Sequence, residues 1–400
     1  MKILVLNSGS SSVKCQYFID RKSVASALVE RIGEEEGYSE VKYNDQTLSS
    51  TDPVSGHYQA LEIILSMLQK SNILSSTDEL DAIGHRVVHG GSDFSEPTLI
   101  TGEVIETIRS LIPLAPLHNP ANLEGIEVVA KADPNLPQVA VFDTAFHQTM
   151  PEYAALYPIP YELYQRSGIR RYGFHGTSHA YVAKQAAEML EEDLNRLNLI
   201  TLHLGNGASA CTIKSGKSID TSMGMTPLEG LMMGTRCGDI DPAIIPFLSH
   251  NHDMDVDTID RLLNKDSGLK GICGTNDMRE VIEQSETNEK MSMLALEMYA
   301  YRIKKYIGAY TATLGRVDAI IFTGGIGEHA VKVREMACEG LNESIGLKID
   351  LIKNEESSKT KRVIHDEESK IKILVIPTDE ELEIALQTEE IITNLTLGHL

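Results

Sequence analysis

Two arginine residues stand in stretches whose neighbours could form part of a binding site. The first, Arg86, lies in the run Gly84 to Gly91, where strand alternation places it on the same face as Val88. A guanidinium group beside an apolar wall suits a small carboxylate, because the fork binds the oxygens and the wall accepts the alkyl end. The alternative is a strand arginine that pairs with a structural aspartate.

The second arginine, Arg236, lies in a Gly- and Met-rich stretch from Thr226 to Asp239. Such a segment could shape the wall of an active site and supply a second cation. Ion pairing of Arg236 with Asp239 or Asp241 would explain the same residue without any site. The residue types alone leave both interpretations open.

One small turn design occurs twice, about half a chain apart. Near the start, an apolar strand runs through Asn7 into a Ser- and Gly-rich turn and returns at Lys14. At mid-chain, a strand ending in His203 and Leu204 enters the turn Gly205 to Gly207. Such turns let the backbone approach an anion closely and direct N–H groups and hydroxyls at it. The first turn alone is explained equally well as an ordinary hairpin loop, but the repetition favours two turns that hold a polyphosphate.

An aspartate and a histidine could act on a bound substrate. Asp143 follows the buried strand 138–142, and carboxylates at such strand ends commonly meet ligands or Mg²⁺, although a helix cap is the alternative. His175 and His179 have a spacing that could hold zinc, but no third ligand is evident. We expect His175 to lie on a loop and donate to developing negative charge, and His179 to lie near the start of the next helix.

Two further segments could contact a nucleotide. Thr323 to Glu328 forms a Gly-rich turn between a strand and a helix, and such a turn can accept a purine ring or a phosphate. Asp277 to Arg279 offers another cation. When each segment is taken alone, an ordinary turn or a surface charge explains it equally well.

The elements that must position these residues alternate between strand-like and helical patterns, which indicates an α/β protein with mixed sheets. The expected strands span residues 2–6, 13–19, 81–89, 138–142, 198–204, 319–322 and 371–376. The expected helices span residues 58–71, 179–190, 291–314 and 379–394, and another carries Val331, Val333, Met336 and Leu341. We expect the helix 291–314 to lie in the core, because its apolar residues occupy more than one face. We expect residues 34–36 and 353–362 to be solvated loops.

The composition limits the class of protein. A chain of 400 residues favours two domains, and 36 basic against 58 acidic residues give a net charge of −22. This balance argues against nucleic acid or an anionic membrane as a partner, because both require clustered Lys and Arg. The five dispersed cysteines indicate reduced thiols, and no apolar run reaches the length of a membrane span. We therefore expect a cytoplasmic enzyme.

Taken together, these segments resemble the acetokinase family within the sugar kinase/Hsp70/actin superfamily. The similarity extends along essentially the whole chain through Asn7 to Lys14, Phe142 to Pro151, Tyr172 to His179, His203 to Gly207, Thr226 to Pro242 and Gly324 to Glu328. The resemblance implies two duplicated actin/Hsp70-like (ribonuclease H-like) domains with mixed sheets around a nucleotide cleft. It assigns residues 1–147 plus about 382–400 to an N-terminal domain and 148–381 to a C-terminal nucleotide-binding domain.

The resemblance also implies roles for individual residues by motif match. The implied ligands of Mg²⁺ (or Mn²⁺) are Asn7 and Glu380. The implied catalytic residues, with Asp143 as acid/base and the histidines as transition-state donors, are Asp143, Arg86, Arg236, His175 and His203. The implied acetate pocket comprises Arg86, Val88, Leu117, Phe174 and Pro227. The implied contacts to ATP or ADP are Lys14, Ser10, Ser12, His203, Leu204, Gly205, Asn206, Gly207, Asp277, Met278, Arg279, Gly325, Ile326, Gly327, Glu328 and His329.

The implied reaction is in-line transfer of a phosphoryl group from ATP to acetate, catalysed by a homodimer. The acceptor is already a carboxylate at neutral pH, so the difficulty lies in bringing two anions together. Propionate kinase activity is one alternative, because a single methylene is worth only about 1–3 kcal/mol of discrimination. A nucleotide-switched binding protein of the same fold is the other, and it would need a partner-binding domain or a polymer interface.

Overall fold

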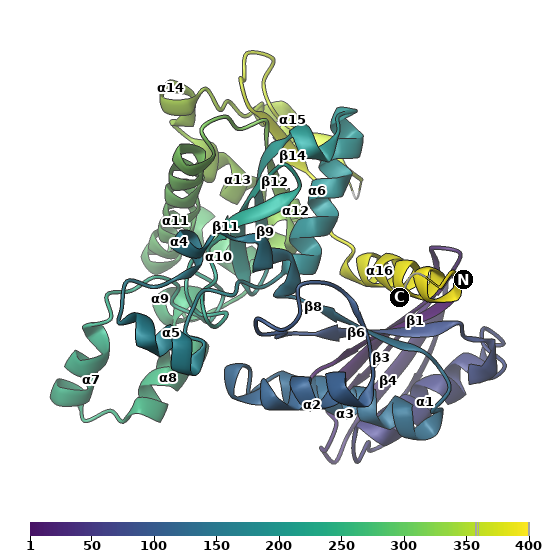
Figure 1. Cartoon of the computed structure of the whole chain (residues 1–400). Coiled ribbons are helices and arrows are strands. Elements are labelled where there is room, and N and C mark those ends of the chain that lie inside the picture. The colour runs from purple at the N-terminus through teal and green to yellow at the C-terminus, as the bar shows by residue number, and fades with distance from the viewer. Residues whose placement is uncertain (357, 359, 399–400) are drawn as a thin grey trace. The chain divides into compact units, whose positions relative to one another are not determined.

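The computed structural model describes residues 1–356, 358 and 360–398, and the chain divides into two compact units. Unit 1 comprises Met1–Phe146 and Asp379–Leu400, and unit 2 comprises His147–Thr378. Each unit contains a mixed β-sheet flanked by helices (Figure 1). Because the chain returns to unit 1 at its end, helix α16 (Glu380–Thr396) packs on the first sheet.

The sheet of unit 1 has the strand order β5-β4-β3-β2-β1-β6-β8-β7. Its strands are β1 (Lys2–Ser8), β2 (Ser12–Ile19), β3 (Lys22–Glu30), β4 (Tyr38–Tyr43), β5 (Gln46–Ser50), β6 (Ala82–Val87), β7 (Thr98–Leu99) and β8 (Gln138–Phe142). Strands β1 to β3 pair in antiparallel fashion, whereas β1, β6 and β8 run parallel. The expected hairpin of β1 and β2 is confirmed, and it aligns Asn7 with Lys14.

The sheet of unit 2 repeats this plan in the order β11-β10-β9-β12-β14-β13. Its strands are β9 (Asn198–Leu204), β10 (Ala208–Lys214), β11 (Lys217–Thr221), β12 (Ala319–Thr323), β13 (Arg362–Val363) and β14 (Lys372–Val375). Strands β9 to β11 are antiparallel, and β9, β12 and β14 are parallel. Three antiparallel strands joined to parallel partners thus occur in both units, which confirms the predicted duplication and the mixed sheets.

Helices cover both sheets. In unit 1, besides α16, they are α1 (His57–Lys70), α2 (Gly102–Ser110), α3 (Asn119–Ala132) and the 3₁₀ turns η1 (Thr77–Glu79) and η2 (Ile112–Leu114), with η3 (Ala145–Thr149) at the junction. In unit 2 they are α4 (Glu152–Ala155), α5 (Tyr161–Ser167), α6 (Gly176–Leu190), η4 (Leu194–Arg196), α7 (Ile244–His252), α8 (Val256–Lys265), α9 (Gly268–Cys273), α10 (Met278–Glu286), α11 (Lys290–Leu314), α12 (Gly324–His329), α13 (Val331–Cys338), α14 (Leu341–Ile345) and α15 (Leu351–Glu355).

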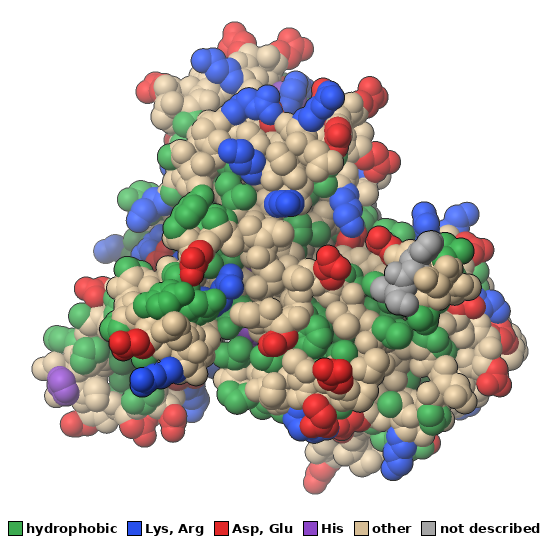
Figure 2. Space-filling model, viewed as in Figure 1, with side chains coloured by type: hydrophobic (Ala, Val, Ile, Leu, Met, Phe, Trp, Pro, Cys, Tyr) green, Lys and Arg blue, Asp and Glu red, His purple; other side chains and the backbone are tan. Residues whose placement is uncertain are grey.

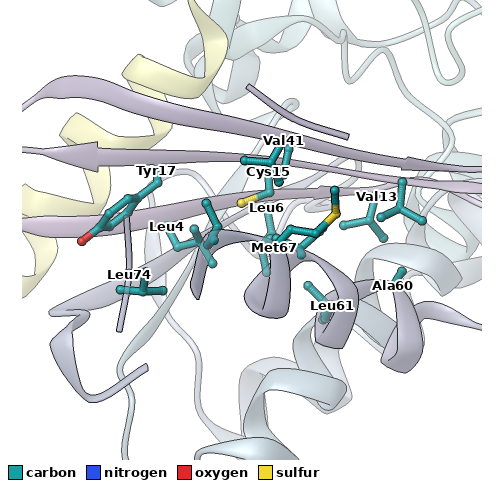
Figure 3. Packing of buried hydrophobic residues seen from close by; sticks show 14 of the residues in the cluster. Leu4, Leu6, Val13, Cys15, Tyr17, Val41, Ala60, Leu61, Met67 and Leu74 are labelled. Atoms are coloured by element: carbon teal, nitrogen blue, oxygen red, sulfur yellow. The ribbon is translucent and has the colours of Figure 1, made fainter. Parts of the chain in front are cut away.

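The largest cluster of buried hydrophobic residues described for unit 1 lies between its sheet and helix α1. Leu61 and Met67 of α1 pack against sheet residues that include Leu6 and Val13 (Figure 3). Helical spacing puts the apolar residues of α1 on one face, and alternation gives β1 its matching face. Full burial of one such side chain contributes about 1.5–3 kcal/mol, so this layer holds β1 firmly in place.

Four expectations about the elements need correction. The long helix α11 lies in the core as expected where it buries residues such as Tyr299 and Ile303, but the expectation fails elsewhere on the helix, since Tyr301 is 60% exposed and Met291 40%. Gly340 has a φ of +76°, which ends α13 before Leu341, so Leu341 begins a separate helix. The stretch 353–362 is not simply a loop, because its first residues belong to α15 and Arg362 to β13, while residues 357 and 359 lie outside the described part. The Gly-rich segment after β12 is itself helical from Gly324.

The surface charges, the helices and the cysteines bear on the expectations drawn from the composition. Basic and acidic side chains are interspersed on the face drawn in Figure 2. Every helix within the described residues is too short or too polar to cross a lipid bilayer. The five cysteines are all free thiols.

Candidate active site

Parallel strand pairing gathers three of the predicted residues in unit 1. Asn7 lies near the carboxyl end of β1, Arg86 near that of β6, and Asp143 directly after β8. Because β1, β6 and β8 are neighbouring parallel strands, their carboxyl ends meet at one edge of the sheet. The polar residues that end these apolar strands are therefore brought together by the topology.

Arg86 and Asp143 form a two-pronged ion pair at this edge. Arg86 Nη2 donates to Asp143 Oδ2 at 2.5 Å, and Arg86 Nε donates to Oδ1 at 3.3 Å. A longer contact of 3.4 Å joins Arg86 Nη1 to Asn7 Oδ1. Burial lowers the pKa of Arg86, but the Asp143 and Glu380 carboxylates outweigh this effect and shift it upward overall. The alternative interpretation, in which Arg86 pairs with an aspartate, is confirmed. That aspartate, Asp143, is itself a predicted site residue.

Glu380 adds a second carboxylate to the group in unit 1. Helix α16 can approach β6 closely because Gly84 has no side chain, and a Cβ there would lie 2.5 Å from Thr388 Oγ1. Asp379 caps this helix by accepting from the Leu382 backbone N–H at 2.9 Å. Burial raises the pKa of Glu380, and Asp143 raises it further against the opposing effect of Arg86. Its Oε1 is buried and, within the described residues, makes no hydrogen bond.

The other predicted residues of unit 1 differ in exposure. Lys14 is exposed on β2 directly across from Asn7, and Ser10 is exposed in the turn beside the half-buried Ser12. Val88 is buried, whereas Leu117 is 64% exposed. Of the predicted residues of unit 1, the structure brings together the two predicted metal ligands, Asn7 and Glu380, and the ion pair of Arg86 and Asp143.

In unit 2, the hairpin of β9 and β10 carries the second turn. Gly205 N–H donates to Gly207 O at 2.9 Å, which closes the turn, and the register aligns His203 with Ser209. The His203 and His175 rings stack with centroids 4.2 Å apart. His203 Nδ1 contacts Ser178 Oγ at 2.8 Å. His175 precedes helix α6 with a φ of +56°, a left-handed conformation that non-glycine residues rarely adopt.

Arg236 lies beside the same turn. A Cβ atom added at Gly207 would lie 3.5 Å from His175 Cε1 and 3.6 Å from Arg236 Nη1, so both side chains approach this glycine. Arg236 Nη1 donates to the Pro227 carbonyl at 3.2 Å. Burial lowers the pKa of Arg236.

The proposed pairing of Arg236 with an aspartate is wrong for the described residues. Asp239 instead accepts from the Gly230 backbone N–H at 2.8 Å and from Tyr306 Oη at 2.8 Å, and Asp241 accepts from the Ala243 N–H at 2.9 Å. No carboxylate in the described part of the chain pairs with Arg236. Its cationic group is therefore available to an anion.

A cavity of about 740 Å³ lies beside this group in unit 2. It is lined by Gly205, Asn206, Asn276, Asp277, Met278, Arg279, Ile282, Gly325, Ile326, His329 and Ala330. Asp277 caps α10, and its bonds to Arg279 hold its pKa down at about 2. The cavity thus joins three of the segments that the sequence singled out, which lie far apart along the chain.

Comparison with known proteins decides the family. The sequence matches the acetokinase family over residues 2–386. It is 64% identical over 396 residues to an acetate kinase of Sulfurovum sp., covering 99% of this chain and 100% of that protein. The fold matches Porphyromonas gingivalis acetate kinase with a TM-score of 0.94 and 44% identity, covering 98% of this chain and 99% of the other. It also matches a propionate kinase from Francisella tularensis with a TM-score of 0.91 and 44% identity, covering 97% and 99%.

The chain belongs to the acetokinase family. Family membership confirms the resemblance stated from the sequence, including the duplicated actin-like fold. Within this acetokinase, the predicted residues fall into two groups. One is the carboxylate and arginine group of unit 1, and the other is the histidine, arginine and nucleotide-pocket group of unit 2.

Several residues near the candidate site of this acetokinase were missed from the sequence. Asn276 lines the cavity and donates to Asn206 Oδ1 at 3.1 Å, and Ile282 lines it one turn along α10. Ser209 contacts the His175 ring at 2.9 Å. The pairing of His203 with Ser209 across the hairpin could have revealed Ser209, whereas Asn276 carried no signal except its position beside Asp277.

The zinc interpretation of His175 and His179 is not supported by the geometry. Across the described residues, no group of three or more His, Cys, Asp or Glu side chains could hold a metal ion. The two ring nitrogens of His179 contact Thr201 Oγ1 at 2.7 Å and Ser209 Oγ at 2.8 Å. His179 therefore belongs to a hydrogen-bond network in the core.

Proposed function

We propose that this chain catalyses the reversible transfer of a phosphoryl group from ATP to acetate, which gives ADP and acetyl phosphate. Family membership limits the reaction class, and acetate is named by the relatives at 51–64% identity. The geometric observation that carries the proposal is Arg236, a partly buried guanidinium group without a carboxylate partner in the described residues, beside the stacked pair of His175 and His203. Uncompensated cationic charge in such a place is suited to an anion.

The chemistry requires little proton transfer. The acceptor oxygen belongs to a carboxylate, whose pKa of about 4–5 keeps it ionised at neutral pH. The barrier arises from repulsion between two anions and from charge that spreads over the transferring group. Arg236 and the N–H groups of His175 and His203 would stabilise that charge, and Arg86 would orient the carboxylate.

Asp143 is held beside Arg86 by the two-pronged ion pair. We propose that it fixes the guanidinium orientation and, as the family resemblance implies, serves as acid/base for the little proton transfer that the reaction requires. Val88, Phe174, Pro227 and Leu117 would form the acyl pocket. Val88 in unit 1 and Phe174 in unit 2 are each apolar and buried, which suits residues that line a pocket for a short alkyl group.

The nucleotide would occupy the cavity of unit 2. Its size suits a nucleoside, and the backbone N–H groups of the Gly205–Gly207 turn suit phosphate oxygens. The other predicted contacts to ATP in unit 2 belong to the segments that line this cavity, whereas Ser10, Ser12 and Lys14 belong to unit 1. Lys14, on unit 1, would add a charge to the phosphates.

A divalent cation fits the residues of unit 1. Glu380 has a buried oxygen without a hydrogen-bond partner in the described part, and Asn7 supplies a neutral oxygen, which is a donor set that Mg²⁺ accepts. We propose that Asn7 and Glu380 hold Mg²⁺, or Mn²⁺, when the nucleotide is bound. The ion would supply positive charge to the phosphate oxygens.

We also propose that the enzyme is a cytoplasmic homodimer. Apolar side chains exposed in unit 2, including Phe247 at 58% and Tyr161 at 52%, support a surface that a second copy would cover. The five free thiols support a reducing compartment. Sedimentation analysis of the purified protein would test the dimer.

A hydroxylamine trap tests the reaction. ATP, Mg²⁺ and acetate should give acyl hydroxamate, and each reaction should be repeated with propionate, because one structural relative is a propionate kinase. Faster turnover at lower KM with acetate supports the proposal, whereas a clear preference for propionate would replace the substrate. Absence of hydroxamate from both acids, with folded protein and Mg²⁺ present, would reject the reaction.

A further inference from the structure

Two buried histidines lie beneath the stacked pair in unit 2. His147 and His179 are both fully buried, and their ring centroids lie 5.7 Å apart. His179 also lies 6.4 Å from His203 in an edge-to-face arrangement. Their hydrogen-bond partners differ in kind, and this difference separates a structural histidine from one that can respond to the site.

The ring of His147 has a fixed protonation pattern. Its Nε2 lies 3.0 Å from the Phe174 carbonyl, which can only accept, so Nε2 carries the hydrogen. Burial lowers the pKa of His147 to about 4, so the ring is neutral and its Nδ1 accepts from Ser218 Oγ at 2.9 Å. This histidine fixes the backbone immediately before His175.

The ring of His179 has no such constraint. Its Nδ1 lies 2.7 Å from Thr201 Oγ1 and its Nε2 lies 2.8 Å from Ser209 Oγ. A hydroxyl can donate or accept, so both tautomers of the neutral ring satisfy both partners. Burial keeps the pKa of His179 well below its ordinary value.

Ser209 joins this ring to His175. The same Oγ that contacts His179 lies 2.9 Å from His175 Nδ1. Ser209 is fully buried, and among the described residues these two ring nitrogens are the partners of its hydroxyl, so the hydroxyl hydrogen is satisfied only if Ser209 donates to one histidine while its oxygen accepts from the other. If it donates to His175 Nδ1, then His179 carries its hydrogen on Nε2 and Thr201 donates to Nδ1. If Ser209 instead accepts from His175, the hydrogen of His179 moves to Nδ1.

We propose that Ser209 is a positioning residue that sets the orientation and tautomer of His175 and couples them to the tautomer of the buried His179. In the first arrangement neutral His175 carries its hydrogen on Nε2, the tautomer that the proposed role as a donor requires. In the second it carries a hydrogen on Nδ1, which also suits the doubly protonated ring. Both arrangements leave the four side chains of the relay, His175, Ser209, His179 and Thr201, hydrogen-bonded, so neither has the penalty of an unpaired buried group.

The inference rests on the proposed function only for the role of His175 as a donor to the transferring phosphoryl group. The relay itself requires only rearrangement of hydrogens among His175, Ser209, His179 and Thr201. The left-handed backbone of His175 adds a reason for a lateral support, because the φ of +56° is a strained conformation that neighbouring contacts must hold.

Ser209→Ala and Ser218→Ala form a matched pair of variants. Each removes one buried serine hydroxyl that contacts histidine in unit 2, but Ser209 contacts both His175 and His179, whereas Ser218 contacts His147. Both should lose similar thermal stability. Ser209→Ala should lower kcat in the hydroxamate assay about 10- to 100-fold with KM values changed less than about twofold, as expected for loss of an orienting partner. Ser218→Ala should retain most of the turnover.

A spectroscopic measurement on the unaltered protein gives a second readout. In ¹⁵N-histidine-labelled protein, the ring nitrogens of His175 and His179 should change tautomer pattern together when MgADP, acetate and aluminium fluoride are added. Ser209→Ala should abolish the change at His179. A response at His175 alone in the unaltered protein, or equal losses of kcat in the two serine variants, would overturn the inference. If the unaltered enzyme forms no hydroxamate, the proposed function fails, while the tautomer measurement with inorganic phosphate still tests the relay.

Discussion

The two site arginines lie in opposite electrostatic settings. Arg86 in unit 1 is bound by both oxygens of Asp143, and carboxylates hold its pKa above the ordinary value. Arg236 in unit 2 has the Pro227 carbonyl as its polar partner, and burial lowers its pKa. One guanidinium is neutralised by the protein, whereas the other is left for a ligand.

The difference separates positioning from binding. A paired arginine is held in a defined orientation, and removing it would leave its carboxylates uncompensated. An unpaired, partly buried arginine costs folding free energy, and that cost is recovered when an anion binds. We therefore expect variants at the two positions to differ most clearly when stability and turnover are measured together.

The largest effect is expected at Arg236. Arg236→Ala should lower kcat about 10²- to 10³-fold, because it removes a donor to the transferring group, while the free energy of unfolding stays the same or rises. Nucleotide affinity should fall little. Hydroxamate formation and urea unfolding measure the two quantities, and Arg236→Lys serves as the control that keeps charge without the planar fork. Nearly normal turnover in Arg236→Ala would reject its role.

Arg86→Ala should lower stability as well as turnover. Loss of the guanidinium leaves the buried Asp143 carboxylate and Glu380 without their cation, at a cost of about 3–5 kcal/mol in the free energy of unfolding. Adding Asp143→Asn to this variant should restore much of the stability but none of the activity. If Arg86→Ala had the same free energy of unfolding as Arg236→Ala, the proposed difference between a paired and an unpaired arginine would be contradicted.

Buried histidines should make both units sensitive to acid. Burial lowers the pKa values of His85 in unit 1 and His147 in unit 2 to about 4. Between pH 6.5 and 4 the unfolded chain binds a proton that the folded site excludes, so stability falls as the pH drops, by about 3 kcal/mol for each histidine.

His85→Gln tests this account in unit 1. The amide N–H group can replace the His85 Nε2–H that donates to Gln138 Oε1 at 2.7 Å, but it does not titrate. Urea unfolding at several pH values should then show a pH dependence smaller by about one proton. An unchanged slope would show that His85 is not excluded from protonation in the folded state.

A smaller effect is expected for the metal. Glu380→Gln removes the charge but keeps one oxygen, so the Mg²⁺ concentration for half-maximal activity should rise about tenfold, which corresponds to about 1.4 kcal/mol. Titration of Mg²⁺ at constant free ATP measures it. Glu381→Gln, one residue further along the same helix, is the matched control, and an equal response in both would argue against Glu380 as a ligand.

The smallest effect is expected at Arg279. Its side chain is 91% exposed and pairs with Asp277 at the rim of the cavity in unit 2. An exposed ion pair contributes about 0–1 kcal/mol, so Arg279→Ala should raise KM for ATP less than about fivefold and leave kcat unchanged. A loss as large as that of Arg236→Ala would show that exposure is a poor guide to the roles of these cations.

The sequence predicted the elements that carry the site with useful accuracy. Short apolar runs located β8 and β9, and the repeated turn identified corresponding strands in the two halves before the sheets showed the same order. The prediction from sequence failed where a contact with another part of the chain decides whether a side chain is buried. Apolar residues on more than one face of α11 indicated a core helix, and much of it is buried, yet Tyr301 is exposed, because periodicity does not say which faces of a helix find a neighbour.

The sequence by itself determined the family, the mixed α/β duplication and the segments that hold the candidate site, since these follow from local patterns and from motifs in a fixed order. Only the tertiary structure decided that Asp143 neutralises Arg86 while Arg236 meets a carbonyl, and that Ser209 stands between His175 and His179. Pairing among such residues depends on strand register, on the close approach allowed at Gly84 and on burial. These are distances between parts of the chain that local residue order does not specify.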